Sequence, residues 1–74
     1  MTTPEDIRRA LETALPGARV SVEDTTGGGD HFEVHVAAAA FAGKTLVEQH
    51  QLVYRALGPL MAEIHALSLR TTVA

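Results

Sequence analysis

The chain has 74 residues, no cysteine, four histidines and a formal net charge of −3 at pH 7. Without cysteine it forms no disulfide and, alone, no cysteine-ligated zinc or iron–sulfur centre. The length allows one domain, which we expect to cover residues 1–74. Leu, Val, Ile and Phe supply about a quarter of the residues, above the roughly 20% below which disorder is expected. A folded domain with a small core is therefore predicted.

No segment of the sequence is suited to crossing a membrane or to secretion. The longest uninterrupted apolar run, Val36–Ala42, is far shorter than the roughly 18–20 residues that a spanning helix needs. The first residues, Met1–Asp6, lack the basic start and apolar stretch of a signal peptide. We therefore expect a cytoplasmic protein.

The first half of the sequence predicts a helix and a β-hairpin. Apolar residues recur at helical spacing over residues 4–15, and Pro16–Gly17 ends that helix. Residues 18–24 and 31–36 alternate between apolar and polar side chains, as half-buried strands do. The glycine-rich residues 25–30 connect them, which favours an antiparallel hairpin. Residues 37–40 are read as the end of the strand and a turn.

Threonines mark the start of both long helices. Thr3 can serve as the N-cap of the first, and Thr45 and Glu48 match a capping box at the start of the second. The second helix carries one broad stripe of mostly apolar side chains, and Gly58–Pro59 ends it. This stripe consists of Leu46, Val47, His50, Val53, Tyr54 and Leu57.

A short helical turn over residues 59–63 and a third strand over residues 64–71 complete the chain. A strand that follows a helical crossover lies parallel to its neighbour. We therefore expect an α+β domain with the order helix-strand-strand-helix-helix-strand, a three-stranded mixed sheet and the helices on one face. This order is similar to a type II KH domain. The GxxG loop with which KH domains clamp nucleic acid is missing, since the junction 57–60 reads Leu-Gly-Pro-Leu.

The histidines are the residues most suited to chemistry, because imidazole is largely neutral and free to bind metal at cytoplasmic pH. His31 and His35 share one strand face but lie about 13 Å apart at roughly 3.3 Å per residue, so they cannot bind one ion together. No nucleophile elbow surrounds Ser21 or Ser68, and no Gly-Lys-Ser/Thr follows the glycines of the loop. An enzyme is therefore not expected.

Several segments together match a known family in order and spacing over residues 5–71. They are Val22–Thr26, Asp30–Val34, Phe41–Lys44, His50–Tyr54 and Ile64–Leu67 with Thr71. On these segments the chain resembles the BolA family of small cytoplasmic or organellar proteins, whose fold is also KH-like without the GxxG loop.

The resemblance implies an adaptor in iron–sulfur cluster trafficking or iron regulation. BolA-like proteins pair with monothiol glutaredoxins and share a bridging [2Fe–2S] cluster with them. The glutaredoxin supplies one cysteine thiolate, and the glutathione it binds supplies another. The resemblance implies His65, at the start of the last strand, as an imidazole ligand, and His31 as a second candidate. No cofactor is expected on the chain alone.

Two other functions stay open. The first is a KH-like nucleic-acid-binding transcriptional regulator, although the acidic charge and Gln49, where family members often have Arg, count against it. The second is an adaptor that binds glutaredoxin without a cluster.

Each histidine also has a purely structural interpretation. His65 alternates in phase with Leu67 and Leu69, which by itself predicts a histidine at the edge of the core. We expect packing or hydrogen bonding for His50 and a solvent-facing position for His35.

Overall fold

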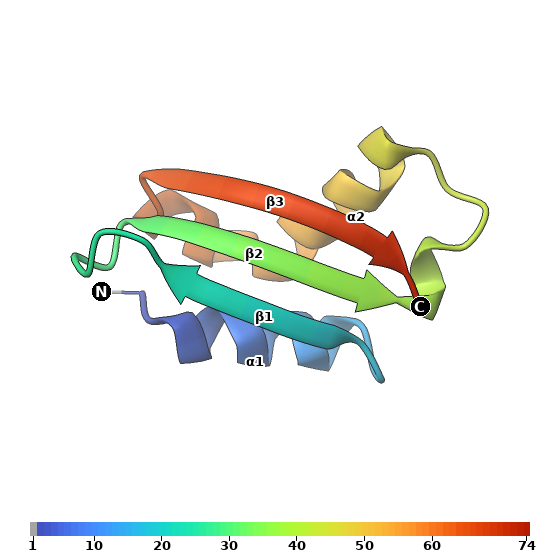
Figure 1. Cartoon of the computed structure of the whole chain (residues 1–74), viewed down its shortest axis with the longest axis horizontal. Coiled ribbons are helices and arrows are strands. Elements are labelled where there is room, and N and C mark those ends of the chain that lie inside the picture. The colour runs from blue at the N-terminus through green and yellow to red at the C-terminus, as the bar shows by residue number, and fades with distance from the viewer. Residues whose placement is uncertain (1) are drawn as a thin grey trace.

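The computed structural model describes residues 2–74 and shows a three-stranded sheet with both long helices behind one face (Figure 1). Met1, with which the predicted domain begins, lies outside the described residues. The elements in chain order are α1 (Pro4–Ala14), β1 (Arg19–Asp24), β2 (His31–Ala38), the 3₁₀ helix η1 (Ala39–Phe41), α2 (Leu46–Leu57), the 3₁₀ helix η2 (Gly58–Glu63) and β3 (Ala66–Val73). The predicted α+β fold class is confirmed.

The sheet has the order β1-β2-β3. β1 and β2 pair antiparallel as the predicted hairpin, and β2 and β3 pair parallel from His31↔Ala66 to Ala38↔Val73. β3 begins two residues later than predicted, because Ile64 is the C-cap of η2 and is buried against the core. His65 therefore precedes the strand instead of belonging to it.

The core lies between the sheet and the helices. Strand β2 supplies its centre, because Phe32, Val34 and Val36 point toward the helices as their alternation predicts. Residues 37–40, predicted as the end of the strand and a turn, divide in that way: β2 continues to Ala38, and η1 then turns the chain and buries Phe41. The buried apolar residues are Ile7, Leu11, Leu15, Phe32, Val34, Val36, Ala38, Phe41, Val53, Leu57 and Ile64.

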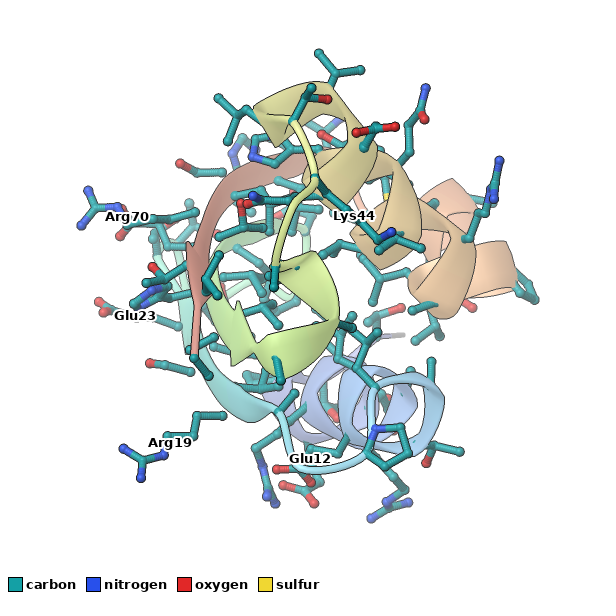
Figure 2. The ribbon with its side chains drawn as sticks, turned by 90° about the vertical axis from the view of Figure 1, so that its right-hand side faces the viewer. Glu12, Arg19, Glu23, Lys44 and Arg70 are labelled. Atoms are coloured by element: carbon teal, nitrogen blue, oxygen red, sulfur yellow. The ribbon has the colours of Figure 1, made fainter. Side chains whose placement is uncertain are left out.

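The other face of the sheet is open to solvent. Arg19, Glu23 and Arg70 extend from it on the side away from the helices (Figure 2). None of the helices in residues 2–74 is long and apolar enough to cross a membrane.

The predicted stripe on α2 is only partly buried. Val53 and Leu57 enter the core, whereas Leu46 is 62% exposed, Val47 66% and Tyr54 42%. The prediction assumed one wide apolar face. Only its Val53–Leu57 side contacts the sheet and α1, so the remaining apolar side chains of the stripe stay on the surface.

A side-chain bridge holds the first turn of α2 against β3. The Thr71 hydroxyl donates to Gln49 Oε1 at 2.6 Å, and Gln49 Nε2 donates to the Lys44 carbonyl at 3.0 Å. Gln49 thus links the edge strand, the helix and the loop before it. Sequence reasoning treated this residue only as a departure from the family's arginine.

Both long helices begin with a complete capping box, at Thr3–Asp6 and Thr45–Glu48. In the second box, hydrogen bonds from Thr45, chiefly from its backbone N–H, lower the pKa of the Glu48 carboxyl below its ordinary value of 4.5. As the pH falls, Glu48 is therefore protonated at a higher pH in the unfolded chain than in the folded chain. The stabilising contribution is present in full above about pH 4.5 and is lost as the pH falls through the folded-state pKa.

We predict that Glu48→Gln reduces the loss of stability on acidification. The glutamine still accepts the Thr45 N–H but does not titrate, so the thermal midpoint should fall less between pH 6 and pH 3 than in the wild type. Circular dichroism melts measure this. Glu33→Gln, which removes a carboxylate from the open sheet face, is the control. Equal acid sensitivity in Glu48→Gln and the wild type would contradict the prediction.

We also predict that Gln49→Ala lowers the free energy of unfolding by about 1–2 kcal/mol through the two lost hydrogen bonds. Thr71→Val should lose part of the same energy, so the double variant should lose less than the sum of the two. Urea denaturation measures all three, with the exposed Gln51→Ala of α2 as control. Strict additivity would show that the Gln49–Thr71 hydrogen bond contributes no coupling energy, and a loss in Gln49→Ala no larger than in Gln51→Ala would contradict the prediction.

Candidate metal centre

The structure brings together the two histidines for which a ligand role is predicted. His31 opens β2 and His65 directly precedes β3. Although they are 34 positions apart in the sequence, their ring centroids lie 5.0 Å from each other, with the ring planes tilted by 43°. The pair lies at the end of the sheet where the parallel strands β2 and β3 both begin (Figure 1).

The backbone of Asp30 produces this approach. Its carbonyl oxygen accepts hydrogen bonds from the N–H groups of His65 and Ala66, at 2.9 and 3.0 Å. This contact starts the parallel ladder, in which His31 lies opposite Ala66. His65 is thereby held one residue before the ladder, beside the first residue of β2.

Both imidazoles can be reached from outside the domain. His65 is exposed and His31 is half-buried. The Oδ2 atom of Asp30 lies 3.9 Å from His31 Nε2, so a carboxylate faces one nitrogen of this ring. Within residues 2–74, no group of three or more His, Asp or Glu side chains is placed to hold a metal ion.

The remaining histidines lie elsewhere. His35 is exposed on the open sheet face, as predicted, and its Nε2 atom is 2.9 Å from the Thr72 hydroxyl of the neighbouring strand. His50 is half-buried on α2 and meets Tyr54 edge to face, with centroids 6.4 Å apart. Its Nε2 atom is enclosed without a hydrogen-bond partner among the described residues, so packing is the interaction that the structure shows for it.

The glycine-rich loop beside the pair is held by side chains. The Asp24 carboxylate accepts the backbone N–H groups of Thr26, Gly27 and Gly29. Gly27 and Gly29 both have φ near +76°, a conformation that side chains disfavour. At the far end of the loop, the Thr25 N–H and hydroxyl both donate to the His31 carbonyl. Sequence reasoning treated this segment as a plain connection, although an Asp before a Thr-Thr-Gly run is typical of such turns.

The arrangement can provide two imidazole nitrogens to one metal centre at an accessible edge. Imidazole is a good ligand for iron, copper and zinc. Because the 74 residues contain no thiol, a centre that also needs thiolates must take them from another molecule.

The comparisons with known proteins agree with this fold. The family model described as BolA-like protein matches residues 11–74. Protein BOLA2 of Arabidopsis thaliana is 42% identical over 71 residues, which is 95% of this chain and 76% of that protein. Human BolA-like protein 2 is 38% identical over 69 residues, covering 90% of this chain and 80% of that protein.

Solved structures give the same result. The structure of a bolA protein homologue from Coxiella burnetii has a TM-score of 0.81 and 44% identity, with 99% of this chain and 92% of that chain covered. The BolA domain of SufE1 from Arabidopsis thaliana has a TM-score of 0.84 and 33% identity, with 95% and 89% covered. Sequence and fold therefore lead to one conclusion: the chain belongs to the BolA-like protein family.

Proposed function

We propose that this chain is a binding module that docks on a monothiol glutaredoxin and contributes His65 and His31 to a shared [2Fe–2S] cluster. The cysteine of the glutaredoxin and its bound glutathione supply the thiolates. The observation that carries the proposal is the pairing of the two imidazoles, with 5.0 Å between their centroids, at an accessible edge of the sheet. Trafficking of iron–sulfur clusters or regulation by iron is the process that such a module serves.

The donor set of the chain fits this group. Two neutral imidazoles are half of the four ligands that a [2Fe–2S] cluster requires, and a cysteine-free chain leaves the thiolate positions to its partner. When bound, the cluster exchanges single electrons, and imidazole ligation raises its potential relative to an all-thiolate cluster. In this proposal the chain holds the imidazole nitrogens of His31 and His65 side by side and docks on the glutaredoxin.

An exposed apolar surface on α2 supports the docking part of the proposal. Val47, His50 and Tyr54 follow one another on a single helical face, at spacings of three and four residues. Val47 and Tyr54 are exposed, and so is Leu46 beside Val47. Exposed apolar side chains grouped on one face are typical of protein–protein contact sites.

The charge distribution gives the nucleic-acid alternative less support. Two of the six basic residues, Arg8 and Arg9, form ion pairs with Glu5 on α1. The Gln49 side chain is engaged with Thr71 and Lys44, so it does not extend toward a phosphate backbone. A shift of short DNA that weakens steeply with salt, at micromolar protein, is the result that would favour this alternative.

We predict that the cluster depends on His65 and, to a smaller degree, on His31. The chain is mixed with a monothiol glutaredoxin, glutathione, iron and sulfide without oxygen, and visible absorption and circular dichroism are recorded. His65→Ala should abolish the spectrum of the mixed complex, and His31→Ala should change and weaken it.

His35→Ala is the matched control, since it removes an imidazole from the open sheet face of the same chain. It should leave the spectrum unchanged. A spectrum indifferent to His65→Ala would contradict the ligand assignment, and the absence of any complex would contradict the whole proposal. A complex that forms without iron and never binds it would leave the adaptor without a cluster as the function.

We further predict that acid releases the cluster. Imidazole binds metal only in its neutral form, and free imidazole titrates near pH 6.5. The spectrum of the mixed complex should therefore be retained at pH 8 and be lost below about pH 6. Far-ultraviolet circular dichroism of the free chain checks that the fold persists at the lower pH. An unchanged cluster spectrum between pH 8 and pH 5.5 would contradict imidazole ligation.

A further inference from the structure

Three hydrogen bonds converge on the Asp24 carboxylate at the start of the glycine-rich loop. Oδ1 accepts the N–H groups of Thr26 and Gly27, at 3.3 and 2.9 Å, and Oδ2 accepts that of Gly29, at 2.9 Å. Both oxygens are therefore occupied by backbone donors. A loop with three consecutive glycines loses much conformational entropy when it is ordered, about 1–2 kcal/mol per residue, and these three bonds offset part of that cost.

The held loop in turn binds the Asp30 side chain through one hydrogen bond. The Thr26 hydroxyl donates to Asp30 Oδ1 at 3.2 Å, and the N–H of Gly28 donates to the same hydroxyl at 3.3 Å. Thr26 is thus bound at its own N–H by Asp24 and at its hydroxyl by Asp30. It transmits the position of one aspartate to the other across the loop.

Asp30 then acts on the imidazole pair in two ways. Its carbonyl oxygen binds the N–H groups of His65 and Ala66. Its Oδ2 atom, on the carboxylate that Thr26 holds, faces His31 Nε2 at 3.9 Å. At 3.9 Å the two atoms are too far apart for a hydrogen bond, so the carboxylate acts on the ring as a nearby negative charge. In metal sites, a carboxylate on the outer side of an imidazole ligand orients the ring.

We propose that Asp24 is a positioning residue for the metal centre: through Thr26 and Asp30 it fixes the orientation of the His31 ring beside His65. This inference rests on the proposed cluster-binding function, because it assigns a purpose to the ring orientation. Among the described residues, Asp24 forms no hydrogen bond or ion pair with either ring. Its removal should free the loop and the Asp30 carboxylate while the strand pairing that holds the backbone of His31 remains.

The first test uses the free chain, without metal or partner. Asp24→Ala should raise the exchange rates of the Gly27 and Gly29 amide protons at least about tenfold, since their acceptor is gone. It should also weaken the nuclear Overhauser contacts between the ring protons of His31 and His65. Asp24→Asn keeps one acceptor oxygen and should give intermediate values. Glu23→Gln removes the same charge one residue away and should behave as the wild type.

The second test uses the cluster reconstituted with a monothiol glutaredoxin, glutathione, iron and sulfide. Asp24→Ala should shorten the lifetime of the cluster against an iron chelator about tenfold, the size of other outer-shell effects at metal sites. In a His31→Ala background, Asp24→Ala should cause no further loss, because the ring that it positions is absent. A change in folding stability alone would act equally in both backgrounds.

The results separate the two proposals. An unchanged ring contact and an unchanged cluster lifetime in Asp24→Ala would overturn the positioning role. The same role would be overturned if Asp24→Ala shortened the cluster lifetime as much in the His31→Ala background as in the wild type. If Asp24→Ala does not fold, Asp24→Asn against Glu23→Gln decides by the same criteria. If the wild-type chain forms no cluster, the proposed function fails, and the free-chain measurements still decide whether Asp24 orients the imidazole pair.

Discussion

The contact on which the rest of the structure depends is the convergence of two backbone N–H groups, from His65 and Ala66, on the Asp30 carbonyl. It starts the parallel pairing of β2 with β3 and so determines which residue lies opposite which along the whole ladder. A change of one residue in this register would point every side chain of β3 to the other face of the sheet. It would also move His65 away from His31. The fold and the imidazole pair thus share one cause.

A domain of 74 residues has little buried surface with which to hold such a register. Local hydrogen bonds therefore help to determine the register and the positions of the helices. Capping boxes begin both long helices, Gln49 ties α2 to β3, and Asp24 orders the loop beside the histidines. Each bond is weak in net terms, at about 0.5–1.5 kcal/mol, but together they determine where the few functional side chains lie.

The sequence predicted those features that depend on local pattern. The alternation around Phe32 and Val34 identified β2 and its buried face, and the Thr45–Glu48 motif identified the start of α2. The exposed part of the α2 stripe was not predictable, because Val47 and Val53 look alike until the packing partners of the helix are known. The start of β3 was misplaced because Ile64 is buried as a helix cap and not as a strand residue.

In the candidate site, too, local pattern predicted some features, and others depended on contacts between distant segments. Position alone predicted that His65 lies at the edge of the core, and only the family resemblance indicated His65 and His31 as ligands. Their approach to 5.0 Å is a long-range contact between segments that no periodicity connects. The roles of Asp24 and Gln49 were missed for a related reason. A hydrogen-bonding side chain reveals its partners only when the turn or strand beside it is folded.

The most direct test of the shared-cluster proposal is pulsed electron paramagnetic resonance of the reduced cluster. The chain is labelled with ¹⁵N at its imidazole nitrogens and assembled with unlabelled monothiol glutaredoxin and glutathione. The proposal predicts strong ¹⁵N couplings from directly bound nitrogen, which are reduced in His31→Ala and unchanged in His35→Ala. A cluster whose spectrum contains only the weak couplings of distant nitrogens would contradict it.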